Sequence, residues 1–367
     1  MKVLGLSSYP VESAATRFRV AQFVDPLRSY GIELILKPFL NSTQYREFYS
    51  PGGFLRKALR LLPSLINRIK ETLTARNYDL VFVQREAIFF GPALFERIFR
   101  TWARGPMVLD LDDATYIRYV SPTYGKAGSM LKFFGKTDSL IKQADLVVCG
   151  NRFIAEYVES KGSHAVVIPT IADPRIFHPV EKPDDVLVIG WVGTHSTYPF
   201  LHSLFPVIRE LSKEHEFIFK VVGAGIEIVD SGIPNLIQEK WTLDREVQNF
   251  QALDIGLYPI RVTETAKQEW LQGKSGFKAI QYMAVGIPFV MSPIGVCAEI
   301  GVPGVTHFNA ITDEDWYEAL VELLLNKDRR HGMGASGRAH SLQHYDIPMH
   351  AASLAHALQE TCSRYAI

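Results

Sequence analysis

The chain has 367 residues, of which 47% are hydrophobic and 21% are charged. This composition is typical of a globular protein with a large apolar core, and the length suits two domains better than one. Lys and Arg total 39 and Asp and Glu total 39, so the net charge gives no reason to expect nucleic acid as a partner, and any anion site must be local.

The cysteines and the hydropathy pattern indicate the cellular compartment of the protein. The three cysteines lack metal-ligand spacing, which favours a reducing compartment: Cys149, Cys297 and Cys362. The opening run MKVLGLSSYP is too short for the apolar core of a signal peptide and is interpreted as a buried strand. No window reaches the roughly 20 apolar residues of a membrane-spanning helix. We therefore expect a cytoplasmic protein, either soluble or peripheral on the inner face of the membrane.

Short apolar runs alternate with longer amphipathic stretches along the whole first half. This alternation predicts βαβ units and a parallel sheet. The predicted strands cover residues 2–6, 33–37, 80–83, 107–110, 146–149 and 165–168. Helices are expected between them, for example over residues 17–30 and 91–101.

A proline-rich linker over residues 169–185 separates this half from a second one with the same pattern. The second set of predicted strands covers residues 186–192, 217–222, 255–258 and 289–291. Helices are predicted over residues 199–213, 245–252, 278–285, 313–325 and 329–342. The sequence thus predicts two Rossmann-like domains, over residues 1–175 and 176–345, and a C-terminal helix over residues 346–367 that packs back toward the first domain. Because ligands bind beyond the carboxyl ends of parallel strands, we expect the two doubly wound domains to face one cleft.

A glycine-rich turn before the helix predicted at residue 278 is the richest candidate site. Its backbone N–H groups and the positive end of the helix dipole converge on one spot. The residues of this site are Gly273, Lys274, Ser275, Gly276, Phe277 and Lys278. The alternative is a plain tight turn with solvated lysines. We interpret the turn as a diphosphate site because so local a cation content is unusual in a charge-balanced chain.

The stretch GKSGFKAIQYMAVGIPFV resembles the donor-binding helix of the family-4 (group 1) glycosyltransferases, which have the two-domain GT-B fold. Residues 144–149, 166–179 and 187–193 resemble further stretches of that family in the same order. The resemblance implies an acceptor-binding N-terminal domain and a C-terminal domain that binds a UDP- or GDP-sugar. It also implies a retaining hexosyltransferase of polysaccharide biosynthesis that needs no cofactor or metal. Its acceptor would be a glycan, a lipid-linked molecule or a small molecule.

The chain departs from the family pattern at the residues that would contact the donor sugar. The family places two glutamates eight positions apart, and the matching residues here are Gly273 and Gln281. Gln281 can still hydrogen-bond a ribose hydroxyl, although without charge. We expect Glu269 to reach in from the preceding loop and Lys274 to replace the cations that the family carries after the first strand of its donor domain.

Two candidates lie in the first domain. Arg17 stands near a predicted helix start, where the dipole disfavours a cation, so we expect either an anion contact or a surface arginine. In VLDLDDATY the carboxylates Asp110, Asp112 and Asp113 crowd a strand end, so one needs a raised pKa or a cationic partner. Asp112 matches the family position beside the transferred sugar, and we assign it to orient or deprotonate the acceptor hydroxyl. The alternatives are a divalent metal on Asp112 and Asp113, or an acidic helix start.

Other strand ends carry weaker candidates. Four residues are interpreted as room for the nucleotide base and ribose: Gly193, Thr194, Gly223 and Gly225. His195 is either a diphosphate contact or a structural residue, and Glu246 is expected to open a helix. The run Gln84, Arg85, Glu86 is left open between an ion pair and acceptor contacts.

The basic amphipathic stretch over residues 53–72 has two interpretations. Its apolar positions, Leu55, Leu59, Leu62 and Ile66, either pack on the domain's own sheet or lie on an anionic membrane surface. Pro63 predicts a kinked helix pair.

The sequence as a whole predicts a retaining glycosyltransferase. A non-catalytic nucleotide-sugar binding or scaffold protein is the alternative from another class, because the two glutamates are missing. A sugar-nucleotide epimerase of the same fold ranks lower, since the clustered carboxylates lie on one side only.

Overall fold

The computed structural model describes residues 1–48, 54–117, 133, 135–183, 186–261 and 268–365. The chain divides into two compact units, which are described one at a time. Unit 1 comprises Met1–Thr170 together with Ile347–Ile367, and unit 2 comprises Ile171–Asp346. Within the described residues each unit holds a six-stranded parallel sheet, so the predicted α/β class with two Rossmann-like units is confirmed.

The sheet of unit 1 has the order β2-β1-β3-β4-β5-β6, so the chain starts in the interior of the sheet and the strand order reverses between β2 and β3. Every residue of β3 and β4 is buried, as expected for strands with helices on both faces. The six strands predicted for this half are confirmed to within one residue at each end: β1 (Lys2–Ser7), β2 (Glu33–Pro38), β3 (Leu80–Gln84), β4 (Met107–Leu111), β5 (Leu146–Cys149) and β6 (Ala165–Val167).

The helix predicted over residues 17–30 is wrong as a single element. The structure has α1 (Ala14–Arg19), a 3-10 turn at Ala21–Phe23 and α2 (Val24–Arg28). Pro26 accounts for part of the break, because proline in a helix interior removes a backbone hydrogen bond and clashes with the preceding turn. In the first turn of α2 its missing N–H has no partner to lose.

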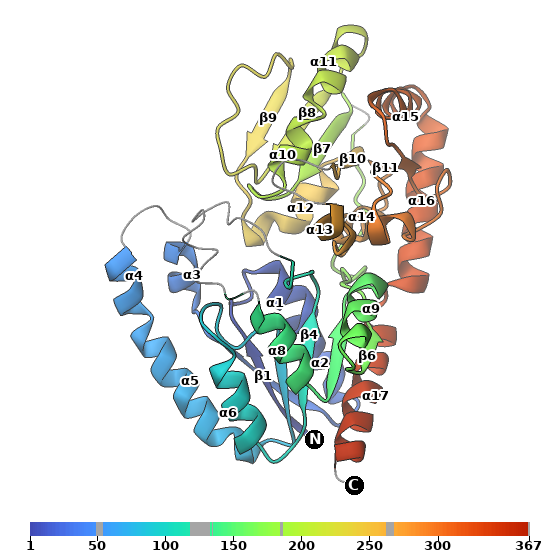
Figure 1. Cartoon of the computed structure of the whole chain (residues 1–367). Coiled ribbons are helices and arrows are strands. Elements are labelled where there is room, and N and C mark those ends of the chain that lie inside the picture. The colour runs from blue at the N-terminus through green and yellow to red at the C-terminus, as the bar shows by residue number, and fades with distance from the viewer. Residues whose placement is uncertain (49–53, 118–132, 134, 184–185, 262–267, 366–367) are drawn as a thin grey trace. The chain divides into compact units, whose positions relative to one another are not determined.

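The other helices of unit 1 flank its sheet, with α4, α5 and α6 together on one side (Figure 1). Their bounds are α3 (Ser42–Phe48), α4 (Phe54–Arg60), α5 (Leu62–Thr74), α6 (Leu94–Trp102), α8 (Gly135–Gln143), α9 (Arg152–Ser160) and α17 (Ile347–Tyr365). The C-terminal α17 packs on unit 1, where Gln359 Nε2 donates to Tyr30 O at 3.1 Å. The guanidinium of Arg100 lies 5.2 Å from the centre of the Tyr365 ring.

The sheet of unit 2 has the order β12-β11-β10-β7-β8-β9. Its four predicted strands are confirmed: β7 (Val188–Val192), β8 (Ile218–Val222), β10 (Ile255–Tyr258) and β11 (Phe289–Met291). The edge strands β9 (Leu236–Glu239) and β12 (Phe308–Asn309) were not predicted. Both are short and only partly buried, so neither has the apolar run that marks an interior strand.

The helices of unit 2 differ from the prediction in two places. The helix predicted over residues 199–213 is replaced by α10 (Tyr198–His202) and α11 (Phe205–Glu214), and the short α13 (Gln268–Gln272) was not predicted. Pro206 lies at the start of α11, where a proline is tolerated. The remaining helices are α12 (Glu246–Gln251), α14 (Phe277–Ala284), α15 (Asp313–Leu325) and α16 (Lys327–His344). The core of this unit includes the fully buried Trp191 and Trp316.

Candidate functional site

The glycine-rich turn of unit 2 leads directly into α14. Gly276 precedes the helix with φ +65° and ψ +10°, in the left-handed region that favours glycine. A β-carbon there would come within 2.1 Å of Ile300 Cδ1, so both backbone and packing require glycine. The turn leaves the first N–H groups of α14 at its N-terminal end, in the arrangement that suits an anion. Gly273, Lys274 and Ser275 lie in this turn as predicted.

Lys278, in the first turn of α14, is the least compensated charge of the site. Its ammonium lies 5.8 Å from the centre of the Trp191 ring and 5.3 Å from that of Tyr258, two side chains from the neighbouring strands β7 and β10. Burial, and after it the charge of Lys274, lowers its pKa to about 8. Among the residues that the structure describes, no carboxylate pairs with Lys278. Its charge therefore lies in a partly apolar setting and next to another cation.

Lys274 and Gln281 lie on either side of Lys278 in the chain. The Lys274 ammonium lies 3.3 Å from the centre of the Trp270 ring of α13. Gln281 is 4% exposed, three residues beyond Lys278 on α14. Glu269 is exposed and belongs to α13, so the prediction that it lies in a loop is wrong. The apolar residues Trp270 and Leu271 complete a helical turn there that the sequence analysis did not identify.

The glycines after β7 and β8 let the neighbouring loops approach each other closely. A β-carbon on Gly193 would come within 2.0 Å of the Trp191 ring, and one on Gly223 within 2.3 Å of Gly193 O. Gly193 and Gly223 thus belong to the same cluster as the ring beneath Lys278. Close packing therefore requires glycine at both positions. The reason predicted from the sequence for these glycines was a different one, which was room for a nucleotide.

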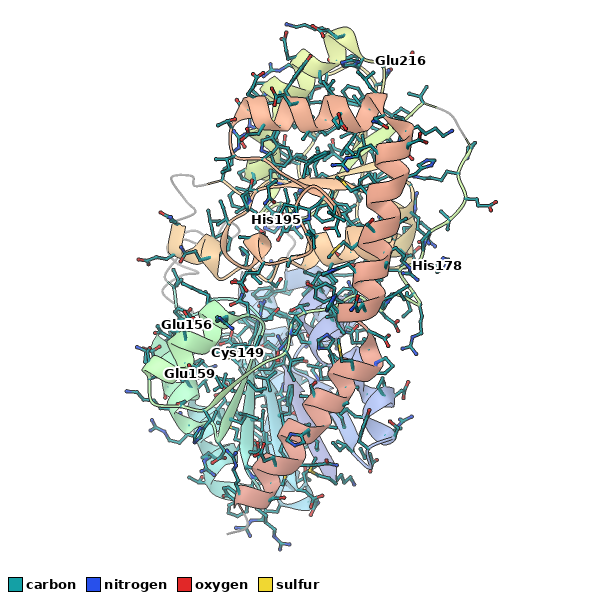
Figure 2. The ribbon with its side chains drawn as sticks, turned by 90° about the vertical axis from the view of Figure 1, so that its right-hand side faces the viewer. Cys149, Glu156, Glu159, His178, His195 and Glu216 are labelled. Carbon is teal, nitrogen blue, oxygen red and sulfur yellow. The ribbon has the colours of Figure 1, made fainter. Side chains whose placement is uncertain are left out.

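His195 and Thr194 continue the loop after β7 (Figure 2). A β-carbon on Gly225 would come within 2.6 Å of His195 Cβ, so these two loops also touch. Thr194 Oγ1 lies 2.9 Å from Ser196 Oγ, and Thr194 O accepts hydrogen bonds from Thr197 N and Tyr198 N. Glu246 opens α12, as predicted.

In unit 1, two of the three carboxylates at the end of β4 have cationic partners, which confirms the prediction made from their crowding. Arg19 Nη2 lies 2.5 Å from Asp110 Oδ1 in a pair with both side chains 1% exposed. Burial raises the pKa of Asp110, and the positive charge of Arg19 opposes this without cancelling it. Asp113 Oδ1 accepts from Ala114 N at 3.0 Å.

Asp112 is held by Arg85 in a two-point ion pair. Arg85 Nε lies 2.6 Å from Asp112 Oδ1, and Nη2 lies 2.9 Å from Oδ2. Burial would raise the pKa of Asp112, but the charge and hydrogen bonds of Arg85 outweigh it and the pKa is lowered. The backbone of Arg85 has φ +59°, which is uncommon outside glycine. A strained backbone that aims a charged side chain is typical of functional sites.

Arg17 does not stand at the start of a helix, so the prediction made from that position is wrong. Arg17 lies in the last turn of the short α1 and not at a helix start, so the dipole does not disfavour its charge. Its Nη1 donates to Val11 O at 2.6 Å and to Glu12 O at 3.2 Å. These two hydrogen bonds hold the loop after β1 in place.

Of Gln84 and Glu86, which the sequence left open, Glu86 has an ionic partner, whereas Gln84 Nε2 has no hydrogen-bond partner among the described residues. Gln84 is buried at the end of β3, and Glu86 Oε2 lies 3.4 Å from Lys136 Nζ. Cys149 ends β5, where burial raises the pKa of its thiol to about 12 (Figure 2). Three features were missed altogether: the Arg19–Asp110 pair, the Arg85–Asp112 pair and the two rings beneath Lys278. None of them is signalled by local spacing, because each joins residues far apart in the chain.

No protein-family model matches the sequence, and no curated protein sequence matches it. Sucrose-phosphate synthase from Thermosynechococcus elongatus is similar in structure, with 12% identity and a TM-score of 0.69 over 99% of this chain and 100% of that one. HepE from Anabaena, solved in complex with UDP-glucose, has 16% identity and a TM-score of 0.69 over 98% and 100%.

A glycosyltransferase from Rickettsia africae is also similar, with 12% identity and a TM-score of 0.65 over 98% of each chain. At these identities the likeness concerns the fold. The chain has the two-unit α/β fold that these proteins share, the GT-B fold.

Proposed function

We propose that the chain is a glycosyltransferase that moves a sugar from a nucleoside-diphosphate donor to an acceptor hydroxyl. The observation that carries the proposal is Lys278, a cation over two aromatic rings with no carboxylate partner among the described residues. A diphosphate would compensate this charge, would lie next to the second cation Lys274, and would meet the positive end of the α14 dipole. The resemblance to family 4 and the GT-B fold agree with this assignment.

In the proposed reaction the bond between the anomeric carbon and the diphosphate oxygen breaks, and the diphosphate leaves with the electron pair. A bond forms between that carbon and the acceptor oxygen, whose proton passes to an oxygen of the leaving diphosphate. Charge builds on the leaving oxygens, where Lys274, Lys278 and the amides of the turn would stabilise it as fixed donors. We propose retention of configuration on the family resemblance alone.

The remaining donor contacts are assigned from their position around the Lys278 cluster. Gln281 is proposed to bind a ribose hydroxyl, with Ser275 and Gly273 at the phosphates and Glu269 near the sugar. The base and ribose are proposed to lie on the loops of Gly193, Thr194, Gly223 and Gly225. HepE, which shares the fold, was solved with UDP and with UDP-glucose, which supports a UDP-sugar as the first donor to test.

Asp112 is proposed to hold the acceptor hydroxyl. A carboxylate whose pKa is lowered is a weak proton acceptor, so the Arg85 pair favours orientation of the hydroxyl over its deprotonation. We assign Arg17 to shaping the loop after β1, through its two carbonyl contacts. The acceptor is proposed to be a glycan or a lipid-linked glycan of polysaccharide biosynthesis.

The test combines binding with turnover. Thermal unfolding is measured with UDP, GDP and ADP and with their sugars, and release of nucleoside diphosphate is then followed with the donor that stabilises. At a hundredfold excess over Kd a donor contributes about 2.7 kcal/mol, which corresponds to a shift of about 5 °C or more. Lys274→Ala should lower turnover strongly, whereas Lys213→Ala, at an exposed position of α11, should not.

Each outcome of this test is informative. Stabilisation by one nucleoside diphosphate together with turnover supports the transferase. Stabilisation without turnover of any donor favours a non-catalytic nucleotide-sugar binding protein. If none of the nucleotides stabilises the protein, the donor site has been assigned wrongly.

A further inference from the structure

The helix α5 turns a polar face toward its own unit. Ser64, Arg68 and Thr72 recur every four residues and are all buried, so they form the inner face. Arg68 Nη2 donates to Ser7 O at 3.0 Å, and its Nη1 donates to Lys37 O at 3.3 Å. The interior contacts of this face thus include hydrogen bonds from a buried arginine.

The opposite face of α5 is apolar and exposed to solvent. Its four large side chains are more than half or about half exposed: Leu62 51%, Ile66 53%, Ile69 50% and Leu73 63%. Leu59 of α4 is 58% exposed, so for Leu59, Leu62 and Ile66 the expected packing on the sheet is wrong. Gly53 and the side chain of Leu55 lie outside the described residues. The break between α4 and α5 falls next to Pro63, as predicted.

The neighbouring helix α6 extends this exposed apolar surface. Leu94, Ile98 and Trp102 recur every four residues along it and are 56%, 38% and 39% exposed. The two helices meet where Trp102 Nε1 donates to Leu73 O at 3.4 Å. We call these seven side chains the α5–α6 face: Leu62, Ile66, Ile69, Leu73, Leu94, Ile98 and Trp102.

The charges around the α5–α6 face have one sign. Among the charged residues of α5, α6 and the turn after α5, those exposed to solvent are Lys70, Arg76 and Arg97. The acids of the two helices are engaged elsewhere: Glu71 Oε2 lies 2.9 Å from Arg68, and the buried Glu96 accepts from Ala87 N at 2.8 Å. The Arg76 guanidinium lies 3.7 Å from the centre of the Trp102 ring.

A pocket beside α5 adds to this positive charge. Its lining includes Lys2, Lys37 and Lys70 together with Glu71. Three ammonium groups face one carboxylate there, and that carboxylate already pairs with Arg68. The pocket is therefore suited to an anionic head group next to the apolar stripe.

We propose that the α5–α6 face docks unit 1 on the surface of an anionic lipid bilayer. The leucines, isoleucines and Trp102 would enter the boundary between head groups and acyl chains, and the basic rim would meet the lipid phosphates. No helix in the described part of the chain combines the length and hydropathy needed to cross a bilayer, so this contact is interfacial. A second copy of the chain fits less well, because a twofold interface would bring the basic rims of both copies together.

The experiment measures co-sedimentation with vesicles of phosphatidylcholine mixed with phosphatidylglycerol, and with vesicles of pure phosphatidylcholine. The wild type should bind the anionic vesicles, and binding should weaken as salt is added. Ile66→Glu/Ile69→Glu should weaken it by about a hundredfold, since burying one such side chain is equivalent to about tenfold or more. Lys70→Ala should weaken it about fivefold. Leu342→Glu, on a comparably exposed leucine of α16 (48%), is the matched control and should bind normally.

Thermal unfolding of each variant verifies that these exposed substitutions leave the fold intact. Quenching of Trp102 by brominated lipid, lost in Trp102→Phe, would place that ring in the bilayer boundary. The proposal is overturned if Ile66→Glu/Ile69→Glu binds anionic vesicles like the wild type, or if neutral vesicles bind equally well. It is also overturned if light scattering shows a dimer that the double variant dissolves while no vesicle binding occurs.

Discussion

The positive charges at the candidate sites of unit 1 and unit 2 are compensated in different ways. In unit 1, Arg19 is enclosed with Asp110 and Arg85 is bound at two points by Asp112, so each cation has its counter-charge within the same unit. In unit 2, Lys278 lies over two rings beside a second lysine, and the described residues offer it no carboxylate. A cation compensated internally is part of the fold. One that is left uncompensated costs free energy until an anion binds.

The comparison also explains the different forms of the two sites. Arg85 and Asp112 are fixed before any ligand arrives, which suits a residue that orients an acceptor. Burial first, and the charge of Lys274 second, lower the pKa of Lys278. The proposed diphosphate would reduce the repulsion between the two lysines, so we expect its binding to stabilise unit 2.

The largest expected effect is in unit 1. Asp110→Asn would leave Arg19 buried without its counter-charge, which typically costs about 3–5 kcal/mol of the free energy of unfolding. Urea unfolding measures this loss. Asp313→Asn is the matched control, because its pair with Arg261 has one side chain 58% exposed and should contribute less than about 1 kcal/mol. Equal losses in the two variants would contradict the view that the Arg19 pair is structural.

Next in size is the loss of ligand binding in unit 2. Lys278→Met should leave the free protein at least as stable as the wild type, because it removes a charge for which the described residues offer no carboxylate, and should weaken UDP binding by about tenfold to a hundredfold. Titration calorimetry with UDP and urea unfolding measure the two effects separately.

Lys220 provides the control for this variant in the same unit. It is 9% exposed on β8 and its ammonium lies 2.9 Å from Glu239. Lys220→Met should lower stability and leave UDP affinity unchanged, which is the reverse of Lys278→Met. If both variants lose stability and neither loses affinity, Lys278 is a structural lysine.

Much of the fold could be predicted because interior strands carry continuous apolar runs. The edge strands β9 and β12 could not, since an edge strand needs no such run. In both errors of helix continuity the helix after the break carries a proline in its first turn, Pro26 in α2 and Pro206 in α11, which the amphipathic pattern alone did not take into account. At these two positions a proline predicts the end of a helix better than the hydrophobic periodicity does.

The sites could be predicted only in part. The glycine-rich turn is local in sequence and was identified, whereas Arg19 and Asp110 are 91 positions apart and nothing in either segment indicates the pair. The inward face of α5 is a different case. Hydrophobicity favours burying Leu62 and Ile66, yet Arg68 is buried, because its hydrogen bonds to the backbone of β1 and β2 compensate its burial.

The smallest expected effect is the pH dependence that Lys278 gives to the free energy of unfolding and to UDP binding. It tests most directly whether the charge compensation differs between unit 1 and unit 2. Its pKa in the folded protein is about 8, lowered from 10.5 by burial first and by Lys274 second. Between these two pH values the unfolded chain binds more protons than the folded one, so this lysine makes the free energy of unfolding rise with pH. Below pH 8 both states carry the proton and the cost of the buried charge is fully present.

UDP binding should follow the opposite trend, because the diphosphate binds the protonated ammonium. Affinity should fall as pH rises above 8, by at most about tenfold for each pH unit, and UDP should take up a proton when it binds near pH 8. Titration calorimetry in buffers of different ionisation enthalpy measures that uptake. Lys278→Met should lack both the affinity change and the proton. An identical pH profile in the variant would mean that the anion binds elsewhere, and the contrast between the two units would then rest on unit 1 alone.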